Sequence, residues 1–106
     1  MLLEIQSNKD KTTGILSLAG VLDISTVDAF NNSLDYFYDV KELIIDFAKI
    51  KFIDSTGIGG VVQAIKYCQK QKIALKITNI SEEVFEILNI LGLPEIFGNE
   101  IFEVIP

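Results

Sequence analysis

The pattern of apolar and polar positions divides the chain into short segments of two kinds. Apolar runs too short for helices occupy residues 2–6, 14–18, 42–47 and 73–77, and they are rich in the branched side chains typical of strands. The polar stretch 7–13 predicts a turn, so the first two strands are expected to form an N-terminal hairpin. The third run has four apolar residues among six and predicts a central strand.

Three further segments repeat apolar residues every three or four positions, the spacing of amphipathic helices. Ser25, Asp54 and Ser81 precede these segments and are the predicted N-caps. The residues expected to face the core are, helix by helix, Val27, Phe30, Leu34 and Phe37; Ile58, Val61, Val62, Ile65 and Cys68; and Val84, Phe85, Leu88 and Leu91. Gly92 and Pro94 predict the end of the third helix.

Strands that alternate with helices predict an α/β domain of two layers. Because the first two strands form a hairpin, we expect a mixed sheet of four to five strands with the helices packed on it. The apolar residues at 96–97 and 101–104 are expected to pack back onto this sheet. No change of composition marks a linker, so one domain over residues 1–106 is predicted, long enough to bury a core without disulfides or metals.

Charge and composition exclude several classes of function. The chain has 9 basic against 15 acidic residues and a formal net charge of −6, which disfavours nucleic-acid binding because phosphate contacts need a surplus of Lys and Arg. It has no histidine and a single cysteine, Cys68, which removes Ser-His-Asp triads, cysteine–histidine zinc sites and disulfides. We therefore expect no catalytic residue, no metal and no cofactor.

The location of the protein is predicted from what the chain lacks. Its N-terminus has no basic start, no apolar stretch of signal-peptide length and no small-residue cleavage site. No uncharged stretch is longer than residues 55–65, which fall far short of a membrane span and are broken by glycines. We expect a cytoplasmic protein that does not insert into a membrane.

Residues 54–60, Asp-Ser-Thr-Gly-Ile-Gly-Gly, carry the most information about function. Asp54 is expected to cap a helix, and Ser55 to point its hydroxyl into solvent. Glycines in the first turns each cost roughly 1 kcal/mol against alanine, a poor local choice unless another backbone or a partner approaches closely. The simplest interpretation is an ordinary N-cap. The glycines, together with an expected loop at residues 48–53, favour a docking surface around a modifiable Ser55.

Phosphate-binding motifs do not explain the same glycines. A P-loop requires a lysine directly after its last glycine, and no lysine follows these glycines until Lys66. A dinucleotide-binding fingerprint requires a third small residue where the chain has Val62, and an acidic residue where the next strand has Lys76. Nucleotide binding is therefore disfavoured.

Four stretches follow one another along the chain: residues 20–23 before the first helix, 45–47 in the central strand, 52–59 at the second helix and 91–93 after the third. This order resembles the STAS domain, and within that family the bacterial anti-sigma factor antagonists, and the resemblance covers nearly the whole chain. Its most specific part is the Asp-Ser-Thr-Gly-hydrophobic-Gly motif. The resemblance implies a regulatory protein rather than an enzyme.

The resemblance also implies a switch. In that family the serine matching Ser55 is phosphorylated by a partner that is both an anti-sigma factor and an ATP-dependent serine kinase, and a serine phosphatase would reset it. The unphosphorylated form binds the kinase and releases the sigma factor. The residues implied to form the partner surface are Asp23, Asp54, Ser55, Thr56, Gly57, Ile58 and Gly59. The alternative is a STAS subunit with a regulatory or scaffold role in a stress-signalling or transport assembly.

Overall fold

The predicted hairpin is present in the computed structural model, which describes residues 2–106. Its strands are β1 (Leu3–Asp10) and β2 (Thr13–Leu22), and β1 pairs antiparallel with β2 along its whole length, from Leu3 opposite Gly20 to Asp10 opposite Thr13. The turn is made by Lys11, whose φ is 57°, and Thr12, so the predicted turn at residues 7–13 is too long. Both strands extend into this polar stretch because one face of the hairpin is open to solvent. Polar side chains on that face remain hydrated, so they carry no desolvation penalty.

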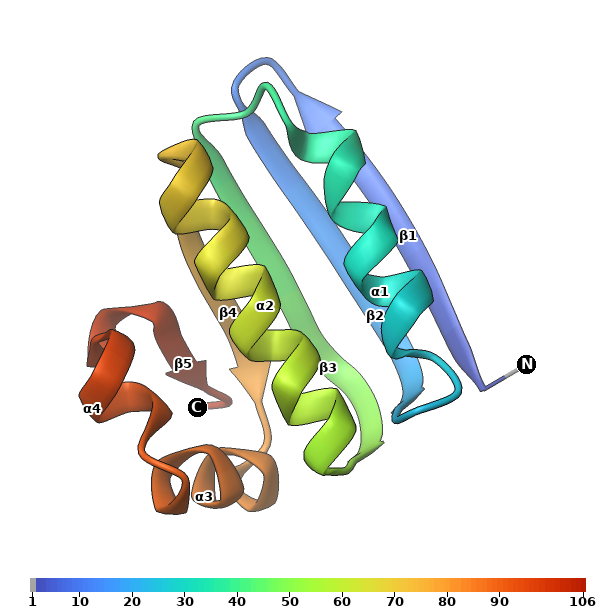
Figure 1. The fold of residues 1–106 in the computed structure, drawn as a ribbon, viewed down its shortest axis with the longest axis vertical. Helices are drawn as coiled ribbons and strands as arrows, with labels where there is room; N and C mark the ends of the chain where they lie inside the picture. The colour runs from blue at the N-terminus through green and yellow to red at the C-terminus, as the bar shows by residue number, and fades with distance from the viewer. Residues whose placement is uncertain (1) are drawn as a thin grey trace.

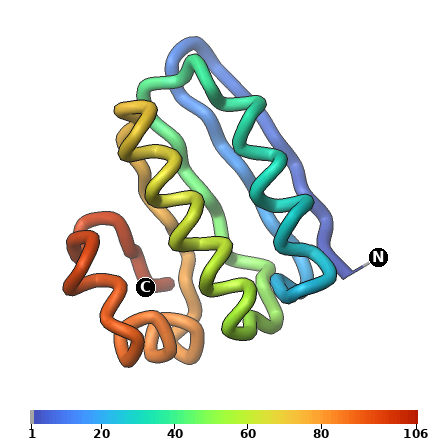
Figure 2. Tube along the Cα trace, in the orientation of Figure 1, coloured from blue at the N-terminus to red at the C-terminus, as the bar shows by residue number. Residues whose placement is uncertain are grey.

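The sheet is mixed, as predicted, and has five strands in the order β1-β2-β3-β4-β5. The remaining strands are β3 (Glu42–Ile53), β4 (Ala74–Ile80) and β5 (Phe102–Val104). Every pair after the hairpin is parallel. Because β2, β3 and β4 point the same way, the loops that follow them meet at one end of the sheet, as the trace in Figure 2 shows.

Helices occupy the connections between the parallel strands. They are α1 (Val27–Ser33) with a 3-10 turn (Leu34–Phe37), α2 (Ser55–Gln71), α3 (Glu82–Ile90) and α4 (Leu93–Phe97), followed by a second 3-10 turn (Asn99–Ile101). Figure 1 shows α1 and α2 side by side on one face of the sheet, with α3 and α4 beside β4 and β5. Within residues 2–106, no helix lies on the opposite face of the sheet (Figure 1).

The core lies between the sheet and these helices. Its fully buried side chains come from both layers and include Leu16, Leu22, Phe30, Phe37, Leu43, Ile45, Ile65, Ile77 and Leu88. The predicted stripes of the first two helices face this core, with Val62 packed at its margin. Val27 is the exception, because it is half-buried and lies outside the core cluster. On the third helix Val84 and Leu88 are buried and Phe85 lies at the margin. Leu91 is exposed, so its predicted place in the core is wrong.

The C-terminal segment agrees with the prediction only in part. Gly92 has a φ of 81°, the left-handed conformation expected of a glycine that ends a helix. Residues 96 and 97, expected to pack back onto the sheet, belong to α4: Phe97 packs against the core, whereas Ile96 is exposed. Phe102 is buried in β5, which confirms that residues 101–104 return to the sheet.

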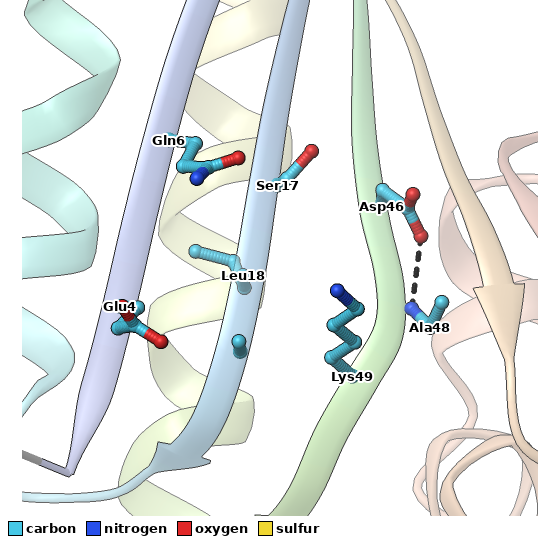
Figure 3. A pocket seen from close by; sticks show the side chains of 8 residues that line it. Glu4, Gln6, Ser17, Leu18, Asp46, Ala48 and Lys49 are labelled. Atoms are coloured by element: carbon cyan, nitrogen blue, oxygen red, sulfur yellow. Dashed lines mark hydrogen bonds between the residues drawn. The ribbon is translucent and has the colours of Figure 1, made fainter.

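The stretch 48–53, expected to be a loop, is the second half of β3. Two register shifts against β2 leave β3 with extra residues there, because Ser17 pairs with Asp46 whereas Ala19 pairs with Lys49. Such bulges interrupt the apolar–polar alternation by which a strand is recognised in sequence. At the first bulge the Asp46 carboxylate accepts a hydrogen bond from the Ala48 N–H at 2.9 Å (Figure 3).

Candidate functional site

The loop between β3 and α2 is built as the sequence predicts. Asp54 has extended backbone angles, and its Oδ1 accepts a hydrogen bond from the Gly57 N–H at 2.9 Å. This bond satisfies one of the free N–H groups at the start of the helix. The predicted N-cap is confirmed, and it fixes Ser55 as the first residue of α2.

The three glycines of this loop have different surroundings. Gly57 is buried, and a Cβ there would collide with the backbone carbonyl of Leu22. Gly60 faces α1, where a Cβ would collide with the Val27 side chain. Gly59 is exposed, and a Cβ there would meet nothing within 4 Å. Two of the glycines therefore allow close packing inside the domain, and one faces outward.

The contacts of the two buried glycines tie α2 to the rest of the domain. The Leu22 carbonyl that Gly57 covers also accepts a hydrogen bond from the Asp54 N–H at 3.3 Å. On the next turn the Gly60 carbonyl accepts a hydrogen bond from Asn31 Nδ2 of α1 at 3.1 Å. The beginning of α2 is therefore held against both the end of β2 and the neighbouring helix.

The predicted partner-binding residues of the motif divide between surface and interior. Ser55 is exposed, and Asp54 and Thr56 are half-buried beside it. Gly57 and Ile58 are buried. These two residues can shape the surface from below, but they offer little of their own area to a partner.

The loop after β2 lies next to this surface. Leu22 pairs with Ile53 in the sheet, so Asp23 follows directly beside the Asp54 loop. The Asp23 carboxylate accepts hydrogen bonds from the Ser25 hydroxyl at 2.6 Å and from the Ser25 N–H at 2.9 Å. The hydrogen bond from the Ser25 side chain holds the pKa of Asp23 below its ordinary value, so the carboxylate is ionised at neutral pH.

These bonds overturn the predicted cap of the first helix. The Ser25 hydroxyl is used by Asp23, and α1 begins one residue later than expected, after Thr26. Thr26 is buried and ties the loop together, since its hydroxyl accepts from the Asp23 N–H at 2.9 Å and donates to the Val21 carbonyl at 2.8 Å. The Asp23 loop is thus stabilised internally and presents its carboxylate at the surface.

Two exposed apolar side chains near this end of the sheet were not singled out as site residues. Ile24 lies between Asp23 and Ser25. Phe52 lies on β3 opposite Val21, two residues before Asp54. Ile24 falls outside the helical repeat in a polar loop, which is a signal that the sequence does contain. Phe52 could not be recognised, because residues 48–53 do not have the pattern of a strand.

A shallow hollow lies on the uncovered face of the sheet, at the first bulge of β3 (Figure 3). It is lined by Glu4, Gln6, Ser17, Leu18, Ala19, Asp46, Ala48 and Lys49. The Asp46 carboxylate is already engaged there by Ala48 and by Asn79 Nδ2, at 3.0 Å. None of the predicted site residues lines this hollow.

The single thiol is not part of the site. Cys68 is buried in α2, and burial raises its pKa to about 11, so it remains a protonated thiol at neutral pH. Across residues 2–106, His, Cys, Asp and Glu side chains form no group of three or more that could hold a metal ion. In the same part of the chain, no helix combines the length and apolar character needed to cross a membrane.

Comparison with known proteins agrees with this geometry. The chain belongs to the STAS domain family, whose model matches residues 4–105. It is 33% identical over 82 residues to the anti-sigma-B factor antagonist of Listeria monocytogenes, an alignment that covers 74% of this chain and 71% of the relative. Within the STAS family this places the chain among the anti-sigma factor antagonists.

Solved structures share the fold. The unphosphorylated anti-sigma factor antagonist SpoIIAA superposes with a TM-score of 0.76 at 21% identity, over 95% of this chain and 88% of that one. The phosphorylated form of SpoIIAA, described as a Bacillus cell fate determinant, gives a TM-score of 0.72 at 20% identity, over 95% and 91% of the two chains. The fold of this chain is therefore that of both forms of SpoIIAA.

Proposed function

We propose that this protein is a cytoplasmic regulator that switches partners according to the phosphorylation of Ser55. The unphosphorylated protein binds an anti-sigma factor that is also a serine kinase. This anti-sigma factor then releases the sigma factor that it held. Phosphorylation of Ser55 by that kinase ends the binding, and a serine phosphatase restores it. The protein is the substrate of these enzymes rather than an enzyme itself.

The observation that carries this proposal is the position of Ser55. Ser55 is an exposed residue at the start of α2, between the Asp54 cap and the outward-facing Gly59. A kinase can therefore reach the hydroxyl without unfolding the helix. The base, Mg²⁺ and ATP needed for the transfer would all belong to the kinase.

Charge explains how a phosphate would act at this position. It adds about −1.5 to −2 charges and three acceptor oxygens. The N-terminus of a helix favours negative charge, so the phosphate is tolerated within the domain. Asp54 and the ionised Asp23 lie at the same surface and make it strongly negative once the phosphate is added. A partner that fits the unmodified surface then loses its binding site while the fold persists.

The likeness to SpoIIAA supports the same account. Both its unphosphorylated and its phosphorylated forms superpose on this chain, with TM-scores of 0.76 and 0.72. A phosphorylated protein can therefore keep this fold. The proposed partner surface consists of Ser55 and its neighbours Asp23, Asp54, Thr56 and Gly59, shaped from below by Gly57 and Ile58.

The proposal is tested by intact-mass spectrometry after incubation with Mg-ATP and each serine-kinase anti-sigma factor of the same genome. The wild type should gain one phosphate, and Ser55→Ala should gain none. Thr56→Ala is the matched control, because it removes the adjacent hydroxyl and should leave the single phosphate in place. Phosphate on Ser55→Ala, or none on the wild type with any of these kinases, would contradict the proposal.

A further inference from the structure

An apolar surface that the phosphorylation switch does not use lies on α3 and α4. Its residues are Ile87, Ile90, Leu91 and Ile96, which are 40%, 75%, 52% and 69% exposed. The first three are spaced by three and four positions and so share one side of the helix. Ile96 lies beside Gly92, the residue that follows Leu91, since a Cβ at Gly92 would lie 3.8 Å from Ile96 Cδ1. We call these four residues the α3–α4 apolar face.

This face is not needed for the core. Helix α3 is anchored by Val84 and Leu88, which are buried, and α4 by Leu93 and Pro94. Single exposed apolar residues are common on protein surfaces and need no explanation, but a contiguous group of them marks a site of interaction.

The charged residues of the segment that carries the face, from α3 to the C-terminus, are all negative. After Lys76 the sequence contains six glutamates and no lysine, arginine or aspartate, whereas the preceding residues carry nine charges of each sign. The whole net charge of −6 therefore falls in the last 30 residues. Glu83 and Glu86 each lie one turn before an isoleucine of the face, and Glu95 is adjacent to Ile96.

The apolar side chains and the neighbouring glutamates together indicate which kind of partner fits this face. We propose that the α3–α4 apolar face binds an amphipathic helical segment of another protein, apolar on one side and flanked by lysine or arginine. A second copy of this chain would bring the same glutamates together, and like charges across an interface are costly. An anionic membrane would be repelled for the same reason. A helix suits the spacing of the face, since apolar ridges three and four residues apart pack against another helix.

The surface is distinct from the phosphorylation switch. Ser55 contributes nothing to it, and none of its four residues belongs to the Asp54 or Asp23 loop. The two proposals can therefore fail separately: Ser55→Ala should bind a partner helix as the wild type does, and a variant of Ile90 should still be phosphorylated.

The test uses a synthetic helical peptide of leucine and lysine, about 18 residues or five turns long, with its leucines on one side. Titrated into the 15N-labelled protein, it should cause saturable chemical-shift changes confined to α3 and α4. Ile90→Asp should weaken this binding at least tenfold, and so should the double change Glu83→Lys with Glu86→Lys. A peptide of the same composition with its leucines scattered should not bind.

Tyr38→Asp is the matched control, because it places the same charge on another exposed apolar side chain and should bind like the wild type. Unchanged thermal unfolding midpoints would show that the variants are folded. Shift changes elsewhere, equal binding of the scattered peptide or undiminished binding by Ile90→Asp would overturn the proposal. So would sedimentation showing a dimer that Ile90→Asp abolishes, or binding of the protein to phosphatidylserine vesicles that Ile90→Asp abolishes.

Discussion

The first two turns of α2 have an inner side, which packs against β2 and α1, and an outer side, which faces solvent. The two sides differ in whether they leave room for a side chain larger than glycine. On the inner side, Gly57 and Gly60 bring the helix against the Leu22 carbonyl and the Val27 side chain. On the outer side, Gly59 touches nothing, and Ser55 faces solvent. Three glycines that are chemically identical therefore have two kinds of purpose, one in folding and the other, we infer, in binding.

The comparison shows how a docking surface can be modified without loss of the fold. The inner side is fixed by backbone and side-chain contacts with β2 and α1, including the hydrogen bond from Asn31 to the Gly60 carbonyl. These contacts do not involve the Ser55 hydroxyl. A change on the outer side should alter binding, and a change on the inner side should alter stability.

The largest effect is expected for Gly57→Ala. The added methyl group would collide with a backbone carbonyl that cannot move without disturbing the pairing of β2 and β3. We expect the free energy of unfolding to fall by about 3 kcal/mol, the upper part of the usual range for overpacking. Urea titration followed by circular dichroism measures it. A decrease in the free energy of unfolding of less than about 0.5 kcal/mol would mean that the inner side accommodates the added methyl group.

Gly60→Ala should have a smaller effect of the same sign. Its methyl group would meet the end of the Val27 side chain, which can change rotamer, rather than the backbone. We expect a loss of about 1.5 kcal/mol in the same titration. If Gly60→Ala were more destabilising than Gly57→Ala, the contact with the Val27 side chain would constrain the helix more than the contact with the Leu22 carbonyl.

Gly59→Ala should act in the opposite direction. Its methyl group has open space around it, and alanine is favoured over glycine within a helix. The free energy of unfolding should rise by between about 0.5 and 1 kcal/mol. A destabilised Gly59→Ala protein would show that this position is constrained by the domain itself and would remove the distinction between the two sides.

The smallest effect concerns the neighbouring Asp23 loop. Ser25→Ala removes the hydroxyl that lowers the pKa of Asp23, so this pKa should rise toward its ordinary value of 3.8. Because the folded pKa is the lower one, the stabilisation is present above pH 3.8 and is lost as the pH falls through the folded value. An NMR titration of the carboxyl carbon measures the shift, with Ser33→Ala as the control. An unchanged Asp23 pKa would rule out this role of Ser25.

The features that the sequence predicts correctly are mostly local. The Asp54 cap and the Gly92 stop depend on residues within one turn, and the hairpin depends on adjacent segments. The exposure of Ser55 follows from its place beside the cap. Such features can be recognised because the chemistry of a few neighbouring residues determines them.

The features that were missed depend on distant partners. Residues 48–53 form a strand only because β2 pairs with them across two bulges. The role of Gly57 depends on the Leu22 carbonyl, far away in sequence. Leu91 is exposed because no segment within residues 2–106 covers that side of α3. Ser25 has the residue type of a cap, but Asp23 competes for its hydroxyl. Periodicity alone cannot predict any of these contacts.

The most direct test of the division between the two sides is Gly59→Arg, measured for both stability and binding. Arginine has better helix propensity than glycine and has open space at this position, so unfolding in urea should be as difficult as in the wild type or slightly more so. Binding to the serine-kinase anti-sigma factor that phosphorylates Ser55 should weaken at least tenfold. Full stability with undiminished binding would contradict the account, since the outer side of α2 would then not be where the partner docks.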